Sequence, residues 1–203
     1  MCIRDSSSAI VASRFTEALA GRQRCLVAHP VNPPHVVPIV ELAGAPWTSP
    51  ETIKRARAIF ESVGQVPIEV KKEIDGFILN RMQAVLLSEA FRLVGEGYVS
   101  AEDLDKTIRD GLGLRWAFMG PFETIELNAP GGIPDYCARY GETLLKLSSA
   151  PVTPDVWGKD NVARAVDSWG RSPEPDAVAG KSRWRDERIA ALVAHKKAQP
   201  KPA

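Results

Sequence analysis

The chain has 203 residues, a formal net charge of +1, 44% hydrophobic residues and 25% charged residues, which is ordinary globular usage. The balanced charge lacks the excess of lysine and arginine that nucleic-acid binding needs, and no apolar run reaches the ~18 residues of a membrane span. Cys2, Cys25 and Cys137 form neither a metal-binding spacing nor a disulfide framework, and the N-terminus has no secretory signal. We therefore expect a cytoplasmic protein of one large or two small domains that binds neither nucleic acid nor membrane.

Residues 6–42 open with a helical pattern and continue with two strand patterns. The serines at 6–8 can cap a helix, and the apolar residues after them recur at helical spacing, which predicts a helix over residues 6–23. The apolar run 25–29 stops at Pro30 and predicts a buried strand, and residues 36–42 predict a second strand.

A second helix and a third strand follow. Ser49, Pro50 and Glu51 form a helix start, in which a capping serine precedes a proline and an acid of the first turn. That helix should run to Val63 and end at Gly64, and residues 66–70 predict a strand. Helix, strand, strand, helix and strand in this order predict an α/β fold for the first part of the chain.

The pattern becomes entirely helical near residue 73. Apolar residues on one face predict a long helix from residue 75 onward, and the stretch from Ser100 to Asp103 resembles a capping box that opens another helix. We expect this helix to end at Gly111. We also expect a linker over residues 171–180 and further helices over residues 120–128, 135–147, 155–169 and 184–197. The fold class is therefore α/β over residues 1–73, then all-α over residues 74–203.

His29 and Glu41 are the first candidate catalytic residues. His29 ends a predicted strand, at the edge of an open α/β sheet where ligands bind, and Glu41 ends the next strand. Neighbouring strand ends can bring the imidazole and the carboxylate into contact, which favours the charged imidazole and fixes its tautomer. A general base that takes a proton from an alcohol needs this arrangement. The alternative is a histidine tied to local backbone beside a solvated glutamate.

Three further polar residues could serve chemistry, and each has a structural alternative. Asn80 lies in an apolar turn, where its amide is suited to bind a hydroxyl that becomes a carbonyl. The alternative is that the Asn80 side chain bonds to the backbone of the domain junction. Ser8 could bind a ligand or simply cap a helix. Arg115 follows a glycine-rich stretch and could bind a substrate carboxylate or pack its stem on Trp116.

Other chemistries fit this sequence less well. The serine run lacks the Gly-x-Ser-x-Gly of a serine hydrolase. His29 and His35 have no third ligand nearby, so no metal site is expected. Gly111 and Gly113 lack the third glycine and the preceding strand of a dinucleotide-binding turn.

Five short motifs stand in a characteristic order along residues 6–130. They are Ser6-Ser7-Ser8, Val27-Ala-His29-Pro-Val-Asn-Pro33, Val40-Glu41-Leu42, Asp75-Gly-Phe-Ile-Leu-Asn80-Arg81 and Gly120-Pro-Phe-Glu123. In order and spacing, these motifs together resemble the 3-hydroxyacyl-CoA dehydrogenase superfamily. Residues 28–34, 110–115 and 183–187 resemble its lambda-crystallin and L-gulonate 3-dehydrogenase branch, so that the resemblance covers most of the chain.

The resemblance implies a role for each candidate residue. His29 would remove the proton of the substrate's secondary hydroxyl, and Glu41 would orient His29 and stabilise its charge. Ser8 and Asn80 would bond to the reacting oxygen or to the base. Hydride would pass to the nicotinamide of NAD, the cofactor that Ser8 and Asn32 would contact.

The resemblance also implies a fold and a departure from it. The fold would be the C-terminal remnant of a Rossmann domain followed by a 6-phosphogluconate-dehydrogenase-like helical domain, which closes the substrate cleft and forms a homodimer. The family's first strands, its Gly-x-Gly-x-x-Gly turn and its acidic ribose-binding residue should precede residue 6, where residues 1–5 look like a spurious start. We therefore expect a longer native protein, and we expect the 203-residue chain alone to bind NAD weakly and to lack dehydrogenase activity.

Two substrate classes and one non-enzymatic use compete. A small 3-hydroxy acid such as L-gulonate needs a cation for its carboxylate, which Arg115 could supply, so we expect NAD-dependent oxidation to the 3-keto acid. A 3-hydroxyacyl-CoA, such as 3-hydroxybutyryl-CoA, needs room for a pantetheine arm that residues 114–118 would crowd. A non-catalytic, crystallin-like structural protein is the third alternative, against which the retained His29, Glu41 and Asn80 argue.

Overall fold

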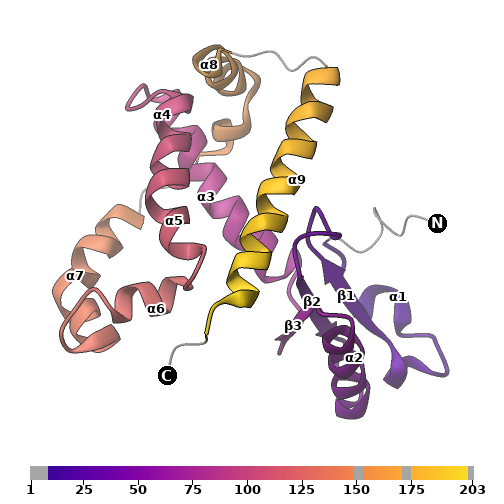
Figure 1. Cartoon of the computed structure of the whole chain (residues 1–203). Helices are drawn as coiled ribbons and strands as arrows, with labels where there is room; N and C mark the ends of the chain where they lie inside the picture. The colour runs from indigo at the N-terminus through magenta and orange to yellow at the C-terminus, as the bar shows by residue number, and fades with distance from the viewer. Residues whose placement is uncertain (1–8, 149–152, 171–174, 201–203) are drawn as a thin grey trace. The chain divides into compact units, whose positions relative to one another are not determined.

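The computed structural model describes residues 9–148, 153–170 and 175–200 (Figure 1). The chain divides into two compact units, one made of Met1–Ala84 with Glu174–Ala203 and the other of Val85–Pro173. Within the described ranges, no helix has both the length and the apolar character to cross a membrane.

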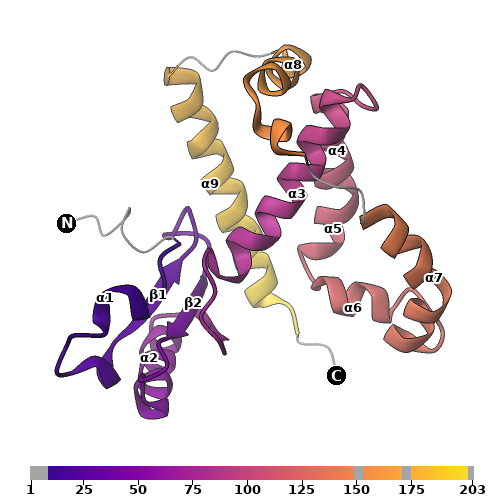
Figure 2. The ribbon, with the colours of Figure 1, turned by 180° about the vertical axis from the view of Figure 1, so that it is seen from behind.

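A three-stranded sheet forms the centre of the first unit. Its strands β1 (Leu26–Pro30), β2 (Ile39–Gly44) and β3 (Val66–Val70) lie in the order β1-β2-β3. β1 pairs antiparallel with β2, and β2 pairs parallel with β3. Helix α2 (Pro50–Ser62) connects β2 to β3 and packs against both strands. Figures 1 and 2 show α2 beside the sheet from opposite sides. The predicted α/β class of this part of the chain is confirmed.

The second predicted strand begins three residues late, at Ile39 instead of Val36. The backbone turns before it, because the amides of Val36 and Val37 both donate to the carbonyl of Pro33. The start and end of α2 agree with prediction. Ser49 accepts a hydrogen bond from the Thr52 amide at 3.2 Å, and the left-handed Gly64 (φ +79°) follows the last turn.

The helix predicted over residues 6–23 is wrong in its length. Among the residues described here, only α1 (Ser13–Thr16) is α-helical, and a 3₁₀ turn follows at Arg22–Arg24. Phe15 and Leu19, which should form the packed face, are about half exposed. A short helix without such packing is only marginally stable in water, which explains why the helical pattern does not become one continuous helix.

The second unit is helical, and no strand follows residue 75 anywhere in the described ranges, as predicted. Its long first helix, α3 (Phe77–Gly95), starts in the first unit. The remaining elements are α4 (Ala101–Lys106), the π-helical turn η2 (Thr107–Leu112), α5 (Gly113–Trp116), α6 (Pro121–Glu126), α7 (Gly132–Ser148), the 3₁₀ turn η3 (Pro154–Trp157) and α8 (Lys159–Trp169).

Gly111 does not end a helix, contrary to prediction. A helix-ending glycine adopts a left-handed backbone, and Gly111 is not among the glycines with positive φ. The chain instead continues from α4 through η2 into α5. The Gly113 amide donates to the carbonyl of Ile108, five residues earlier, and a Cβ on Gly113 would lie 2.8 Å from that carbonyl oxygen. The absence of a side chain at Gly113 therefore permits the π-helical turn.

The predicted linker over residues 171–180 is wrong for its second half. Helix α9 (Pro175–Ala198) begins at Pro175, since a proline fits the first turn of a helix, where its missing amide is not needed. Residues 171–174 lie outside the described residues.

A glycine-to-alanine change at Gly95 should strongly destabilise the second unit. The buried Asn161 donates from its amide to the carbonyls of Phe91 at 3.1 Å and Val156 at 2.8 Å. A Cβ on Gly95 would overlap the side-chain oxygen of Asn161, so these bonds must break or α3 must shift. We expect Gly95→Ala to lower the free energy of unfolding by about 2–3 kcal/mol in urea titrations.

Gly141→Ala is the matched control. Gly141 lies within α7, and nothing stands within 4 Å of the position its Cβ would take. Alanine should therefore stabilise this helix by about 0.5–1 kcal/mol. Equal stability of the two variants would contradict the close contact at Gly95.

Candidate active site

His29 and Glu41 face each other across two neighbouring strands. They are directly paired in the antiparallel register of β1 and β2, and His29 Nδ1 lies 2.8 Å from Glu41 Oε2. Both side chains are buried. The predicted contact is confirmed, but its structural basis differs from the expectation. Glu41 lies inside β2 instead of at its end, and antiparallel pairing brings the two residues together.

The second oxygen of Glu41 holds the start of α3. Glu41 Oε1 accepts hydrogen bonds from the backbone amides of Ile78 at 2.9 Å and Leu79 at 3.1 Å. These amides are among those that a first helical turn leaves without a partner within the helix, and a carboxylate at that end also complements the helix dipole. Burying a charge without partners is costly, and the three hydrogen-bond donors offset that cost for the fully buried carboxylate of Glu41.

Phe77 completes the cluster, and sequence reasoning missed it. Its fully buried ring lies beside the imidazole of His29, with ring centroids 5.1 Å apart and planes tilted by 36°. The sequence offered one signal, Gly76, which adopts the left-handed backbone at φ +78° just before Phe77. Neither periodicity nor composition indicates that the next residue packs on a histidine of another element.

This geometry suits a general base. An ionised carboxylate only accepts hydrogen bonds, so the Nδ1 of His29 must donate to Glu41, and Nε2 then carries the free lone pair of a neutral imidazole. No group of the described residues bonds to Nε2. The arrangement can accept a proton at Nε2 and stabilise the resulting positive charge through Glu41.

The other candidates lie in different surroundings. Asn80 is half-buried in the first turn of α3, one residue beyond the amide of Leu79 that Glu41 anchors. Asn32 is exposed just past the end of β1, and its side chain has no hydrogen-bond partner among the described residues. Its amide group can both donate and accept hydrogen bonds. Ser8 lies outside the described residues.

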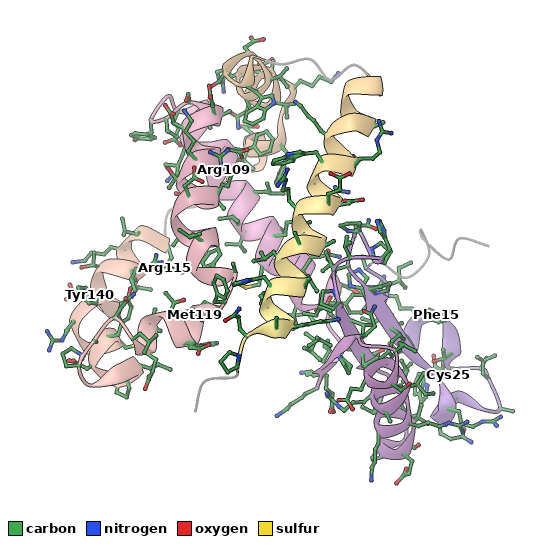
Figure 3. The ribbon with its side chains drawn as sticks, viewed as in Figure 1. Phe15, Cys25, Arg109, Arg115, Met119 and Tyr140 are labelled. Carbon is green, nitrogen blue, oxygen red and sulfur yellow. The ribbon has the colours of Figure 1, made fainter. Side chains whose placement is uncertain are left out.

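Arg115 belongs to the second unit, where it lies exposed on α5, as labelled in Figure 3. In the same stretch, Arg109 donates to Asp110 at 3.0 and 2.7 Å, and this guanidinium holds the pKa of the Asp110 carboxyl below its usual value. Arg109 is thus neutralised by its neighbour. Arg115 bonds to no side chain of the described residues, which leaves its planar fork able to take a carboxylate.

A metal centre does not emerge from the part of the chain that the structure describes. There, no three His, Cys, Asp or Glu side chains gather in an arrangement that could hold a metal ion.

Comparisons with known proteins place these features in a family. Residues 2–74 match the family described as 3-hydroxyacyl-CoA dehydrogenase, NAD binding domain, and residues 76–166 match the 3-hydroxyacyl-CoA dehydrogenase, C-terminal domain. A crystal structure of 5-formyl-3-hydroxy-2-methylpyridine 4-carboxylic acid 5-dehydrogenase, an NAD⁺-dependent dismutase, superposes with a TM-score of 0.79 and 28% identity. The match covers 95% of this chain and 63% of that one.

Curated relatives agree with this assignment. Rabbit (Oryctolagus cuniculus) lambda-crystallin is 45% identical over 94% of this chain and 60% of its own length. L-carnitine dehydrogenase of Pseudomonas putida is 35% identical over 94% of this chain and 60% of its own length. The chain thus spans about three-fifths of the length of these relatives. Through its two domain matches, which together span most of its length, the chain belongs to the 3-hydroxyacyl-CoA dehydrogenase family.

Proposed function

We propose that the protein containing this chain oxidises the secondary hydroxyl of a 3-hydroxy acid to the 3-keto acid, with NAD as the cofactor. The observation that carries this proposal is the buried His29–Glu41 pair, whose Nδ1–Oε2 distance of 2.8 Å leaves Nε2 as the acceptor. The family's NAD-binding and C-terminal domains supply the context for this chemistry.

In this mechanism, His29 Nε2 accepts the hydroxyl proton, and Glu41 stabilises the imidazolium that forms. Asn80 and Ser8 would bond to the reacting oxygen, and Asn32 and Ser8 would contact the cofactor. Bound NAD would supply the acceptor for the hydride on the carbon that bears the hydroxyl. Loss of the proton and loss of the hydride together leave a carbonyl.

The direct experiment joins the first strands and the Gly-rich turn of a family member ahead of Ser6. The resulting hybrid should reduce NAD with L-gulonate, measured as NADH absorbance. The 203-residue chain alone should bind NAD weakly and show no turnover, because the pyrophosphate of NAD normally rests on the Gly-rich turn and the helix after it. Micromolar NAD binding by the chain alone would contradict this expectation.

A small acid is the preferred substrate class because of Arg115 and its surroundings. Leu114, Trp116 and Phe118 are all substantially exposed around Arg115, and bulky side chains in this stretch would crowd a pantetheine arm. The structural relative with a TM-score of 0.79 is, by its name, a dehydrogenase of a small carboxylic acid.

Replacement of Arg115, the candidate partner of the substrate carboxylate, tests this preference for a small acid. In the hybrid, Arg115→Ala should raise the KM for L-gulonate about tenfold to hundredfold, since a bond to a charged group contributes about 1.5–3 kcal/mol. Arg109→Ala is the control, because Arg109 already pairs with Asp110 and should not bind substrate. Unchanged activity of Arg115→Ala on L-gulonate would contradict the assignment.

A 3-hydroxyacyl-CoA is the second candidate substrate. The descriptions of both matching domains name this class, as does a 3-hydroxyacyl-CoA dehydrogenase structure from Archaeoglobus fulgidus with a TM-score of 0.61 and 26% identity. Comparison of kcat/KM for L-gulonate and 3-hydroxybutyryl-CoA in the hybrid separates the two classes. If the hybrid binds NAD but oxidises neither, the crystallin-like structural alternative is favoured.

A homodimer formed through the helical domain is also part of the proposal. Several large apolar side chains of the second unit are exposed, and exposed apolar patches can mark protein–protein interfaces. Sedimentation of the chain should give twice the 22.1 kDa of one copy, and a 22.1-kDa species at every concentration would contradict the dimer. The exposed apolar residues on α5, α6 and α7 and after α6 include Leu114, Phe122, Leu127, Tyr140, Leu144 and Leu147.

A further inference from the structure

Phe77 has an unusual backbone for a bulky residue. Its φ of +51° lies in the left-handed region, and among the described residues no other non-glycine residue has a positive φ. This conformation is unfavourable for an aromatic residue, and it persists only where the surroundings fix it. Residues in such conformations often cluster at functional sites.

Hydrogen bonds fix the backbone on both sides of Phe77. The Gly76 amide donates to the carbonyl of Ala9 at 3.1 Å, and the Phe77 amide donates to the carbonyl of Ile74 at 3.1 Å. The next two amides, those of Ile78 and Leu79, donate to Glu41 Oε1. Glu41 therefore holds the turn that carries Phe77, and with its other oxygen it holds His29.

The turn directs the Phe77 ring onto the imidazole. The centroids of the Phe77 and His29 rings are 5.1 Å apart, and Phe77 has no exposed surface. Phe77 is also part of the buried cluster that contains Val27 and Ala43, the residues two positions along the strands from His29 and Glu41. The ring thus covers the imidazole from the side of the core, where it limits rotation of the imidazole and keeps water from the Nδ1–Glu41 bond.

We propose that Phe77 is a positioning residue for the base. Its left-handed turn, which the hydrogen bonds on both sides fix, holds the ring against His29. The ring in turn keeps the Nδ1–H hydrogen-bonded to Glu41 and keeps the lone pair of Nε2 pointing in one fixed direction. This inference rests on the proposed role of His29.

The test uses NMR of the 203-residue chain without substrate or cofactor, so it does not depend on turnover. The wild-type chain should show nuclear Overhauser contacts between the Phe77 and His29 rings, a single His29 tautomer protonated at Nδ1, and slow exchange of the Nδ1 proton with water. Phe77→Leu, which removes the ring and keeps an apolar side chain, should speed that exchange by about tenfold or more, because water then reaches the bond. Phe77→Tyr, which keeps the ring, should leave the exchange of the Nδ1 proton as slow as in the wild type.

Phe91→Leu is the matched control, since Phe91 also forms an aromatic pair, with Trp157 at 4.9 Å, but in the other unit. Its His29 signals should equal those of the wild type. Unchanged Nδ1 proton exchange in a folded Phe77→Leu variant would overturn the proposal. If Phe77→Leu does not fold, the wild-type spectra decide: ring contacts with slow exchange support the proposal, and their absence overturns it. Failure of the hybrid to oxidise L-gulonate would instead count against the proposed function alone.

Discussion

Glu41→Ala should lower the free energy of unfolding by about 3–5 kcal/mol, because it removes the buried acceptor shared by three donors, of which the His29 ring is buried and the two amides are partly buried. The variant leaves the Nδ1 of His29 without its partner inside the buried site, and it also removes the acceptor of the Ile78 and Leu79 amides at the start of α3. Glu41→Gln should cost only about 1 kcal/mol, since its amide oxygen can still accept from the first turn of α3. Urea unfolding followed by circular dichroism measures both changes.

Glu69→Ala is the control on the neighbouring strand. Glu69 lies on β3 and forms an ion pair with Arg57 at 3.8 Å, with nearly half of its side chain exposed. An exposed pair of this kind contributes about 0–1 kcal/mol. If Glu41→Ala proved as mild as Glu69→Ala, then Glu41 would not anchor His29 and α3 together.

His29→Gln in the hybrid should lower kcat by about 10²–10⁴-fold, which is the usual contribution of a general base. Glutamine can bond to Glu41 but has no site that accepts the hydroxyl proton at neutral pH. The KM for L-gulonate should change little, because Arg115 is proposed to bind the carboxylate. Initial rates of NADH formation measure both quantities.

His35→Gln serves as the control for this loss. His35 is exposed, and its Nε2 lies 3.1 Å from Asp186 Oδ2 on the surface of the same unit. We expect full activity from this variant. Equal losses for His29→Gln and His35→Gln would show that imidazole loss acts through the fold and not through the proposed proton transfer.

Local chemistry explains which elements the sequence could predict. Ser49, Pro50 and Gly64 determine the start and end of α2 through capping and a left-handed turn, and these effects involve only a few neighbouring residues. The motifs around His29 and Glu41 likewise identified the two residues that the structure joins at 2.8 Å.

The predictions that were wrong concern features that tertiary contacts determine. The helix expected over residues 6–23 lacks a packed face. Gly111 lies inside a π-helical turn, which is possible because Gly113 has no side chain. The direction of pairing between β1 and β2 is not encoded in either strand alone, so the sequence indicated the contact of His29 with Glu41 but not its geometry. Phe77 was missed for the same reason, because its partner lies 48 positions away in the chain.

The most direct test of the central claim compares kcat for three hybrid variants, Glu41→Gln, His29→Gln and the double variant. Glutamine at position 41 turns a donor toward Nδ1, so the His29 proton moves to Nε2 and the base is lost, although the fold remains. If His29 and Glu41 act as one unit, each single variant should lose about 10²–10⁴ in kcat, and the double variant should be no slower than His29→Gln alone. Losses that multiply in the double variant, or full activity of Glu41→Gln, would contradict the account.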